Sequence, residues 1–169
     1  LVRKMRMGYN LKTVLKNCEL LAKAGFKDHV SVNYSFNVID ERPETIRQTV
    51  AYHRELEKIF GPEIVEPSIF FIGLQPHTLL EEYGLKNGLL KPGYNPMSLM
   101  PWTARKLLWN PEPMGKEFGR ICLEAFDTNP NDFGRTVMHL LERDYGISSL
   151  NEALTVEAKN RPVLAKSLR

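Results

Sequence analysis

VSVNYSFNVI, the sequence of residues 30–39, alternates apolar and polar side chains from its first residue to Val38. Successive side chains of a β-strand point to opposite faces, so this pattern predicts a strand with one apolar face and one polar face. The apolar face carries Val30, Val32, Tyr34, Phe36 and Val38. The polar face carries Ser31, Asn33, Ser35 and Asn37.

Amphipathic helices are expected on both sides of this strand. Upstream, one helical face is formed by Leu11, Val14, Leu15, Cys18, Leu21 and Ala22. Asn10 is expected to cap the start of that helix, and Gly25 to end it. Downstream, a helix is expected from Pro43 to Gly61, with a buried stripe of Ile46, Val50, His53, Leu56 and Phe60.

A second strand is predicted at Ile69–Gly73, since Pro67 argues against an earlier start inside a sheet. A strand, a helix and a strand of these lengths most simply form a right-handed crossover that joins parallel neighbours. The sequence therefore predicts an α/β fold.

The rest of the chain divides into three predicted parts. Residues 1–84 hold the α/β unit, which closes with a short helix from Thr78 to Tyr83. Residues 85–113 are rich in proline, contain Trp102 and Trp109, and are expected to form a loop or lid. Residues 114–169 are expected to be helical. Their apolar faces are Phe118, Ile121, Cys122 and Ala125, then Phe133, Val137, Leu140 and Leu141, and Ser149 with Glu152 forms a capping box for a last helix.

Composition argues against several classes of protein. The net charge is only +3, and no basic block interleaves with aromatic residues, so nucleic acid is not expected as a partner. No apolar run approaches the ~18 residues that span a membrane. Two distant cysteines, Cys18 and Cys122, give no disulfide framework and favour a cytoplasmic location. The four histidines lack metal-ligand spacing, so no metal site is predicted.

The polar face of the first strand has two interpretations. In a barrel this face would line the lumen and leave room for a polar ligand. In an edge strand the same side chains would simply face water. The pattern alone leaves both open.

The turn after the first strand lies where ligands bind in parallel α/β folds. Arg42 is suited to hold a carboxylate or a phosphate, and Asp40 or Glu41 to accept a hydrogen bond from a ribose hydroxyl. The acidic residues Asp40, Glu41 and Glu44 also suit the start of a helix without any ligand. Both interpretations stay open, the second most readily for Glu44.

The turn after the second strand is the corresponding position. Gly73 allows a close backbone approach, and Gln75 and His77 offer hydrogen-bond donors. Pro76 and Thr78 are equally typical of a turn and a helix cap that bind no ligand. No phosphate loop, His-Glu-x-x-His motif or Gly-x-Ser-x-Gly motif accompanies these turns, so no catalytic residue is assigned.

Several short motifs follow one another between residues 6 and 93. They are RMGYN at 6–10, LAKAGF at 21–26, PET at 43–45 with Thr49, and PHT at 76–78 before a helix expected to end at Gly84. Their order resembles the second half of a radical S-adenosylmethionine enzyme of the cobalamin-associated branch. In that family the first strand closes on Gly-x-Pro-Gly-Glu-Thr and the next ends near Pro-Gly-Thr. This chain departs from the family with Asp40, Arg42, Pro43 and His77.

The resemblance implies a partial parallel (β/α) barrel, followed by a helical C-terminal region. Members of the family cleave S-adenosylmethionine with a [4Fe–4S] cluster, and the branch is associated with cobalamin. The cluster needs three closely spaced cysteines, Cys-x-x-x-Cys-x-x-Cys, which Cys18 and Cys122 do not provide. The chain, which begins without Met, is therefore expected to be a C-terminal fragment that is inactive without the N-terminal half of the same parent protein.

The resemblance also implies where a cofactor or a small-molecule substrate would bind. Ser35 and Asn37 of the first strand, Arg42 of its turn and Gln75 of the second turn would contact it. The segment 85–113 and the helices after it would shape access for the substrate.

Two other hypotheses remain open. The chain could be a non-catalytic α/β module that binds a protein partner, with Trp102 and Trp109 at the interface. It could also belong to a different barrel enzyme that uses the turn at residues 40–44 for acid–base chemistry.

Overall fold

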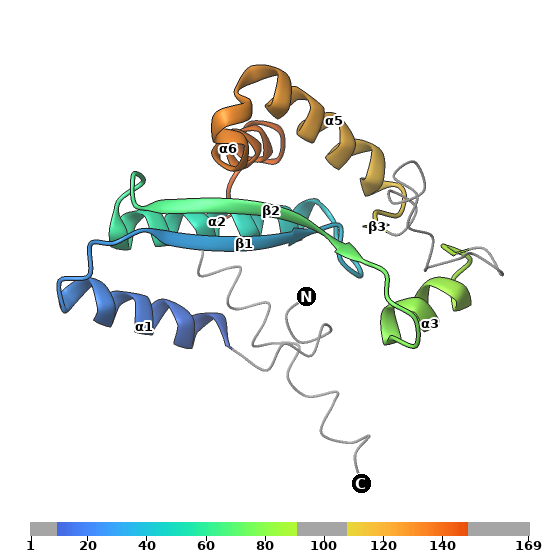
Figure 1. Ribbon diagram of the computed structural model, residues 1–169, viewed down its shortest axis with the longest axis horizontal. Helices are drawn as coiled ribbons and strands as arrows, with labels where there is room; N and C mark the ends of the chain where they lie inside the picture. The colour runs from blue at the N-terminus through green and yellow to red at the C-terminus, as the bar shows by residue number, and fades with distance from the viewer. Residues whose placement is uncertain (1–9, 91–107, 149–169) are drawn as a thin grey trace, which may run out of the picture.

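The computed structural model describes residues 10–90 and 108–148. The elements are α1 (Leu11–Lys23), β1 (Val30–Phe36), α2 (Pro43–Phe60), β2 (Val65–Gly73), α3 (Leu79–Lys86), β3 (Leu108–Trp109), α5 (Met114–Thr128), the 3₁₀ turn η2 (Pro130–Asp132) and α6 (Phe133–Tyr145). β1 and β2 are parallel, and β3 pairs antiparallel with the end of β2, in the order β1-β2-β3. The chain is thus α/β with a small mixed sheet (Figure 1). Within the described ranges, no helix is both long and apolar enough to cross a bilayer.

β1 confirms the predicted alternation but ends earlier than expected. The strand was expected to reach Ile39, whereas it stops at Phe36 because Asn37 adopts the left-handed conformation, with φ of 53°. Asparagine tolerates this region better than most residues. Asn37 therefore leaves the polar face that the sequence assigned to it, and its side chain is buried.

β2 starts at Val65, four residues earlier than predicted, and includes Pro67. The Val30 amide donates to the Ile64 carbonyl (2.9 Å), and Val30 is paired with Val65. In a parallel ladder that begins with this hydrogen bond, the backbone groups of the even-numbered residues of β2 bond to β1. The backbone of Pro67, an odd-numbered residue, therefore faces the opposite edge of β2. Its missing N–H therefore costs no ladder hydrogen bond, which is why the proline is tolerated.

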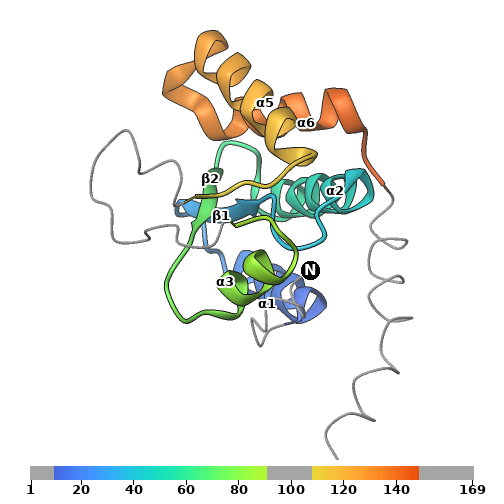
Figure 2. The same ribbon diagram turned by 90° about the vertical axis from the view of Figure 1, so that its right-hand side faces the viewer.

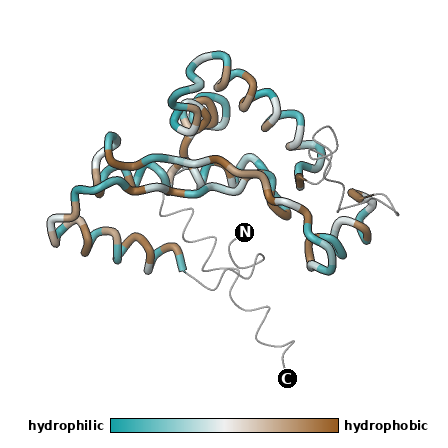
Figure 3. Tube along the Cα trace, viewed as in Figure 1, coloured by the Kyte–Doolittle hydropathy of each residue, from teal (hydrophilic) through white to brown (hydrophobic). Residues whose placement is uncertain are grey.

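One face of the sheet is covered by helices, and the core lies beneath them. The larger cluster is formed by Tyr34, Phe36, Ile46, Val50, Met114, Phe118, Ile121, Ala125, Val137, Met138, Leu140 and Leu141. It joins β1 to α2, α5 and α6, and it includes most of the apolar residues predicted for those helices. Hydrophobic and hydrophilic positions alternate along α5, as expected of an amphipathic helix (Figure 3).

α1 packs against α2 and the start of the sheet. The Asn10 side chain caps it as predicted, accepting from the Lys12 amide (2.8 Å), and Gly25 follows with φ of 86°. Leu15 is buried, but Leu21, predicted to be buried with it, is 50 % exposed. The contact with α2 is narrower than the apolar stripe of α1, so one flank of the stripe remains exposed.

Two glycines mark close packing between elements. A Cβ on Gly134, in the first turn of α6, would overlap the backbone carbonyl oxygen of Pro67 in β2. A Cβ on Gly84, in α3, would press on the side chains of Leu90 and Trp109. α6 therefore lies directly on β2, and Leu90 and Trp109 meet at α3.

The region after β2 differs from the prediction. The short helix runs to Lys86 rather than ending near Gly84, so it crosses the boundary expected at residues 84–85. The two-residue strand β3 was not expected. Residues 91–107, with Trp102, and the predicted cap at Ser149 and Glu152 lie outside the described residues.

Candidate functional site

The polar side chains of β1 lie on a face of the sheet that no described helix covers. This open face consists of Ser31, Asn33 and Ser35 of β1 together with their partners in register, Glu66, Ser68 and Phe70 of β2. In Figure 2 the labelled helices α2, α5, α6 and α1 lie beside, above and below the two strands. Ser35, predicted to contact a cofactor, is exposed at the carboxyl end of this face.

Asn37 connects the end of β1 to the segment that enters α5. Its Nδ2 donates to Asn110 Oδ1 (2.6 Å) and to the Pro111 carbonyl (2.8 Å), and the residue is 3 % exposed. Both hydrogens of the amide are thereby used inside the protein. The predicted contact of Asn37 with a cofactor stays a prediction, and the structure gives the residue a tethering role that the sequence did not suggest.

Arg42 lies at the amino end of α2 with an exposed guanidinium. Its Nε is 3.7 Å from a carboxylate oxygen of Glu44, and both side chains are more than half exposed, so the pairing is weak. The backbone around it is well held, because the Arg42 amide donates to Thr45 Oγ1 (3.0 Å). Arg42 is thus a cation on a fixed backbone at the carboxyl end of β1, free to turn towards an anion.

Glu41 is less available than its neighbour. The Thr45 hydroxyl donates to its carboxylate, and burial raises the pKa of Glu41 above its usual range. The carboxyl group is therefore engaged with the first turn of α2, which favours the helix-start interpretation over ribose binding for this residue.

The turn after β2 presents Gln75 and His77, both exposed, at the same end of the sheet. His77 has φ of 60°, and its amide donates to a carboxylate oxygen of Glu81 (2.7 Å). Thr78 caps α3 by accepting from the Glu81 amide (3.3 Å). Pro76 and Thr78 thus act as turn and cap, while the Gln75 amide stays open to a ligand.

The cysteines do not form a metal centre. Cys18 lies on α1 and Cys122 on α5, and burial raises the pKa of both thiols. Among residues 10–90 and 108–148, no three His, Cys, Asp or Glu side chains are grouped as metal ligands. Two cysteines in the whole sequence cannot supply the three thiolates of a [4Fe–4S] cluster, so this chain alone does not fit that group.

A buried polar network lies under the covered face of the sheet. His53 is 1 % exposed, and its Nδ1 is 3.1 Å from the Tyr34 hydroxyl while its Nε2 is 3.4 Å from a Glu57 carboxylate oxygen. Arg54 links Glu57 to Glu142 of α6. The helical spacing predicted that His53 is buried. The residues of the network come from β1, α2 and α6, and no pattern in the sequence predicted that they meet.

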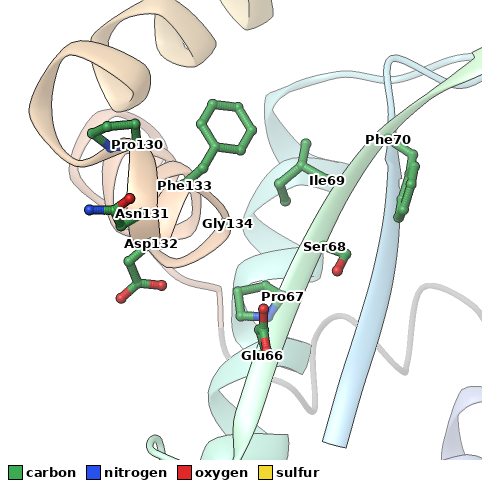
Figure 4. Close-up of a pocket in the computed structure, with 10 residues that line it drawn as sticks. All are labelled: Glu66, Pro67, Ser68, Ile69, Phe70, Pro130, Asn131, Asp132, Phe133 and Gly134. Carbon is green, nitrogen blue, oxygen red and sulfur yellow. The ribbon is translucent and has the colours of Figure 1, made fainter.

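A cavity of about 300 Å³ lies away from the predicted site, between β2 and the turn that precedes α6 (Figure 4). It is lined by residues 66–70 and 130–134. Ile69 and Phe133 face each other across it in Figure 4. None of the predicted site residues contributes to this cavity.

Comparisons with known proteins give no identification: no protein-family model, no curated protein and no solved structure matches this chain.

Replacing Asn37 with alanine is expected to lower the free energy of unfolding by about 2–3 kcal/mol, because two hydrogen bonds are lost and alanine is strained at positive φ. Glycine at this position loses the same bonds without the strain, so Asn37→Gly should cost about 1 kcal/mol less. Urea unfolding of both variants measures the difference. Equal losses would show that the left-handed backbone is not retained.

The stability of the chain is expected to fall as the pH drops below about 6.5. Burial lowers the pKa of His53, and the charges of Arg54 and Arg135 lower it further, against the raising effect of Glu57 and Glu142. Between the two pKa values, His53 is therefore protonated in the unfolded chain and neutral in the folded chain. This contribution of His53 to stability is fully present above its pKa in the unfolded chain. It is lost as the pH falls towards its pKa in the folded chain, by at most about 1.4 kcal/mol per pH unit.

Urea unfolding of the wild type and of His53→Gln between pH 8 and pH 5 tests this. The free energy of unfolding of the variant should change less with pH than that of the wild type. The pKa of Glu41 is raised, so its contribution has the opposite sign, present at low pH and lost as the pH rises through the folded pKa. Both proteins carry Glu41, so its effect cancels, and parallel curves would contradict the assignment to His53.

Proposed function

We propose that this chain is the C-terminal part of a radical S-adenosylmethionine enzyme of the cobalamin-associated branch, acting in the cytoplasm on a small-molecule substrate. The observation that carries the proposal is the one-sided sheet. Its parallel strands are covered by helices on the apolar face, whereas the polar side chains Ser31, Asn33 and Ser35 are left uncovered by the described helices. A barrel segment removed from its barrel would expose its lumen side in this way.

The carboxyl end of the open face would be the binding end. Ser35 offers a hydroxyl, Gln75 an amide and Arg42 a guanidinium, which together suit a ligand that carries both a carboxylate and ribose hydroxyls. S-adenosylmethionine has both. Asn37 would contribute indirectly, by fixing the turn that follows Ser35.

The N-terminal half of the parent protein would hold the cluster, since this chain lacks the cysteines. A cluster held there would supply the electron for cleavage of S-adenosylmethionine, and this chain would contribute binding and orientation on the substrate side of the barrel. Cobalamin, if the parent uses it, would likewise be held outside this chain.

The parent gene and its product test the proposal together. A Cys-x-x-x-Cys-x-x-Cys segment should be encoded upstream of Leu1, and the full-length protein, reconstituted without oxygen, should be brown and release 5′-deoxyadenosine. A full-length protein that lacks this segment would contradict the proposal. Within an active parent, Arg42→Ala is expected to weaken S-adenosylmethionine binding by about tenfold or more, as for loss of a hydrogen bond to a charged group.

Arg47→Ala is the matched control for that variant. Arg47 also pairs with Glu44 (3.2 Å), but it lies one turn into α2, away from the carboxyl end of β1. Equal losses for the two variants would mean that only the helix start, and not Arg42 itself, affects the ligand.

One observation favours the alternative, a non-catalytic interaction module. Leu123 and Phe126 of α5 are 68 % and 62 % exposed, which is unusual for large apolar side chains on one helix. Trp109, expected at such an interface, is buried at 2 % and cannot contribute. A protein partner lost on Phe126→Ala, from a parent with no cluster motif, would favour this alternative.

A further inference from the structure

Tyr34, His53 and Glu57 place a phenol, an imidazole and a carboxylate in a row inside the core. The Tyr34 hydroxyl is 3.1 Å from His53 Nδ1, and His53 Nε2 is 3.4 Å from a Glu57 carboxylate oxygen. The rings of Tyr34 and His53 meet edge to face, with centroids 5.6 Å apart. All three groups lie on the covered side of the sheet, whereas the proposed ligand would bind on the open face, so the proposed function gives them no role.

The two contacts of His53 determine which ring nitrogen carries its hydrogen. An ionised carboxylate can only accept a hydrogen bond, so the nitrogen that faces Glu57 is the protonated one, and Nε2–H donates to Glu57. Nδ1 is then an acceptor, and the Tyr34 hydroxyl donates to it. Arg54 binds the other oxygen of the Glu57 carboxylate and holds it in place. The hydrogen bonds therefore run in one direction, from phenol to imidazole to carboxylate.

Tyr34 is poorly placed to lose its phenolic proton to water. The residue is 8 % exposed, and its ring stacks on that of Phe36. Burial raises the pKa of Tyr34 well above its usual range, and the neighbouring Tyr52 and Glu57 raise it further. The phenol therefore stays protonated around neutral pH, and any reaction that removes its proton needs a base inside the core.

His53 is suited to be that base. Burial lowers the pKa of His53, as do the charges of Arg54 and Arg135. Glu57 and Glu142 act in the opposite direction. The imidazole is therefore neutral at neutral pH and free to accept a proton at Nδ1, and Glu57 would stabilise the imidazolium that results. A tyrosine hydrogen-bonded to such a base can lose an electron and a proton in one step.

We propose that Tyr34 and His53 form a proton-coupled redox site. A one-electron oxidant outside this chain, a metal-centred or organic radical species, takes an electron from Tyr34. The phenolic O–H bond breaks, and its proton moves to His53 Nδ1. Tyr34 becomes a neutral tyrosyl radical, His53 becomes an imidazolium paired with Glu57, and the oxidant is reduced by one electron. An electron from a reductant such as ascorbate, with the proton returned by His53, restores the phenol.

This chemistry needs no S-adenosylmethionine, so it is tested on the 169-residue chain by itself. The oxidant is a photogenerated ruthenium(III) polypyridine complex whose potential is too low to oxidise N-acetyltyrosinamide at the same pH. The wild type should give the electron paramagnetic resonance spectrum of a neutral tyrosyl radical, and Tyr34→Phe should not. Tyr145, half-buried at the end of α6 beside Glu117 and Asp144, is the matched control, and Tyr145→Phe should keep the signal. No signal in the wild type, or an equal signal in Tyr34→Phe, would overturn the proposal.

His53→Asn separates the base from the hydrogen bond. The asparagine oxygen can accept from Tyr34 near the position of Nδ1, but it does not take up the proton. Oxidation of Tyr34 should therefore slow by about a hundredfold or more, in a variant shown to be folded by circular dichroism. In the wild type, which needs no variant, oxidation should be slower in D₂O than in H₂O and should slow at acidic pH as His53 becomes protonated. An unchanged rate in folded His53→Asn, or a wild-type rate that depends on neither solvent isotope nor pH, would contradict the role of His53.

Glu57 is expected to act through His53, as a positioning residue. Because Glu57 raises the pKa of His53, Glu57→Gln should shift the acidic limb of the rate profile to lower pH and should slow oxidation on the plateau above it. A purely structural contribution of Glu57 would lower the urea midpoint and leave the pH profile where it is. That result would remove Glu57 from the site.

Discussion

Gly134→Ala is expected to lower the free energy of unfolding by about 3 kcal/mol or more. The added Cβ would overlap the carbonyl oxygen of Pro67, and both sides of this contact are backbone, so no flexible side chain can move aside. α6 would have to lift from β2, which separates the buried Val137 and Leu141 from the sheet. Urea unfolding monitored by far-ultraviolet circular dichroism measures the loss.

Gly119→Ala is the matched control. Gly119 lies in α5, and an added Cβ would meet no atom within 4 Å. Alanine is the better helix former, so this variant should gain about 0.5–1 kcal/mol. A loss below about 1 kcal/mol for Gly134→Ala, with the gain for Gly119→Ala intact, would mean that α6 does not lie on Pro67 as described.

Phe118→Ala is expected to cost about 3–5 kcal/mol, the range for a fully buried phenylalanine. Its ring is 1 % exposed and lies 5.0 Å from the ring of Phe36 and 6.4 Å from that of Phe71, measured between centroids. The side chain contacts both long strands, so its removal leaves a cavity where sheet and helix meet. The shift of the urea midpoint measures the cost.

Phe126→Ala makes the same chemical change on the same helix at an exposed position. Its effect on stability should stay within about 0.5 kcal/mol. Similar costs for the two variants would show that the orientation of α5 is not the one described.

Much of the fold could be predicted because each element carries a clear periodic pattern. The alternation in residues 30–36 and the helical stripe of α2 led to the right strand, helix and parallel pairing. The start of β2 was wrong because proline was taken as a barrier, and only the register shows that Pro67 faces the unpaired side. β3 was missed because two residues carry no period.

The candidate site could be predicted less well. Sequence position placed Arg42 and Gln75 correctly at the carboxyl end of the strands, since that follows from the order of the elements alone. The role of Asn37 depends on Asn110, which is 73 residues away, and no local pattern reports such a contact. Whether Ser35 and Arg42 bind a cofactor stays a prediction, because the missing half of the proposed barrel would decide it.

The meeting of Leu90 and Trp109 at Gly84 has a consequence for how the sequence can vary. The chain leaves α3 at one of these side chains and returns to the sheet at the other, so both ends of the intervening stretch are anchored at one point. When two points of a chain are held together in this way, each doubling of the number of residues between them costs only about 0.6 kcal/mol of closure entropy. A change in the number of residues between Leu90 and Trp109 is therefore expected to alter the free energy of unfolding of the described residues very little.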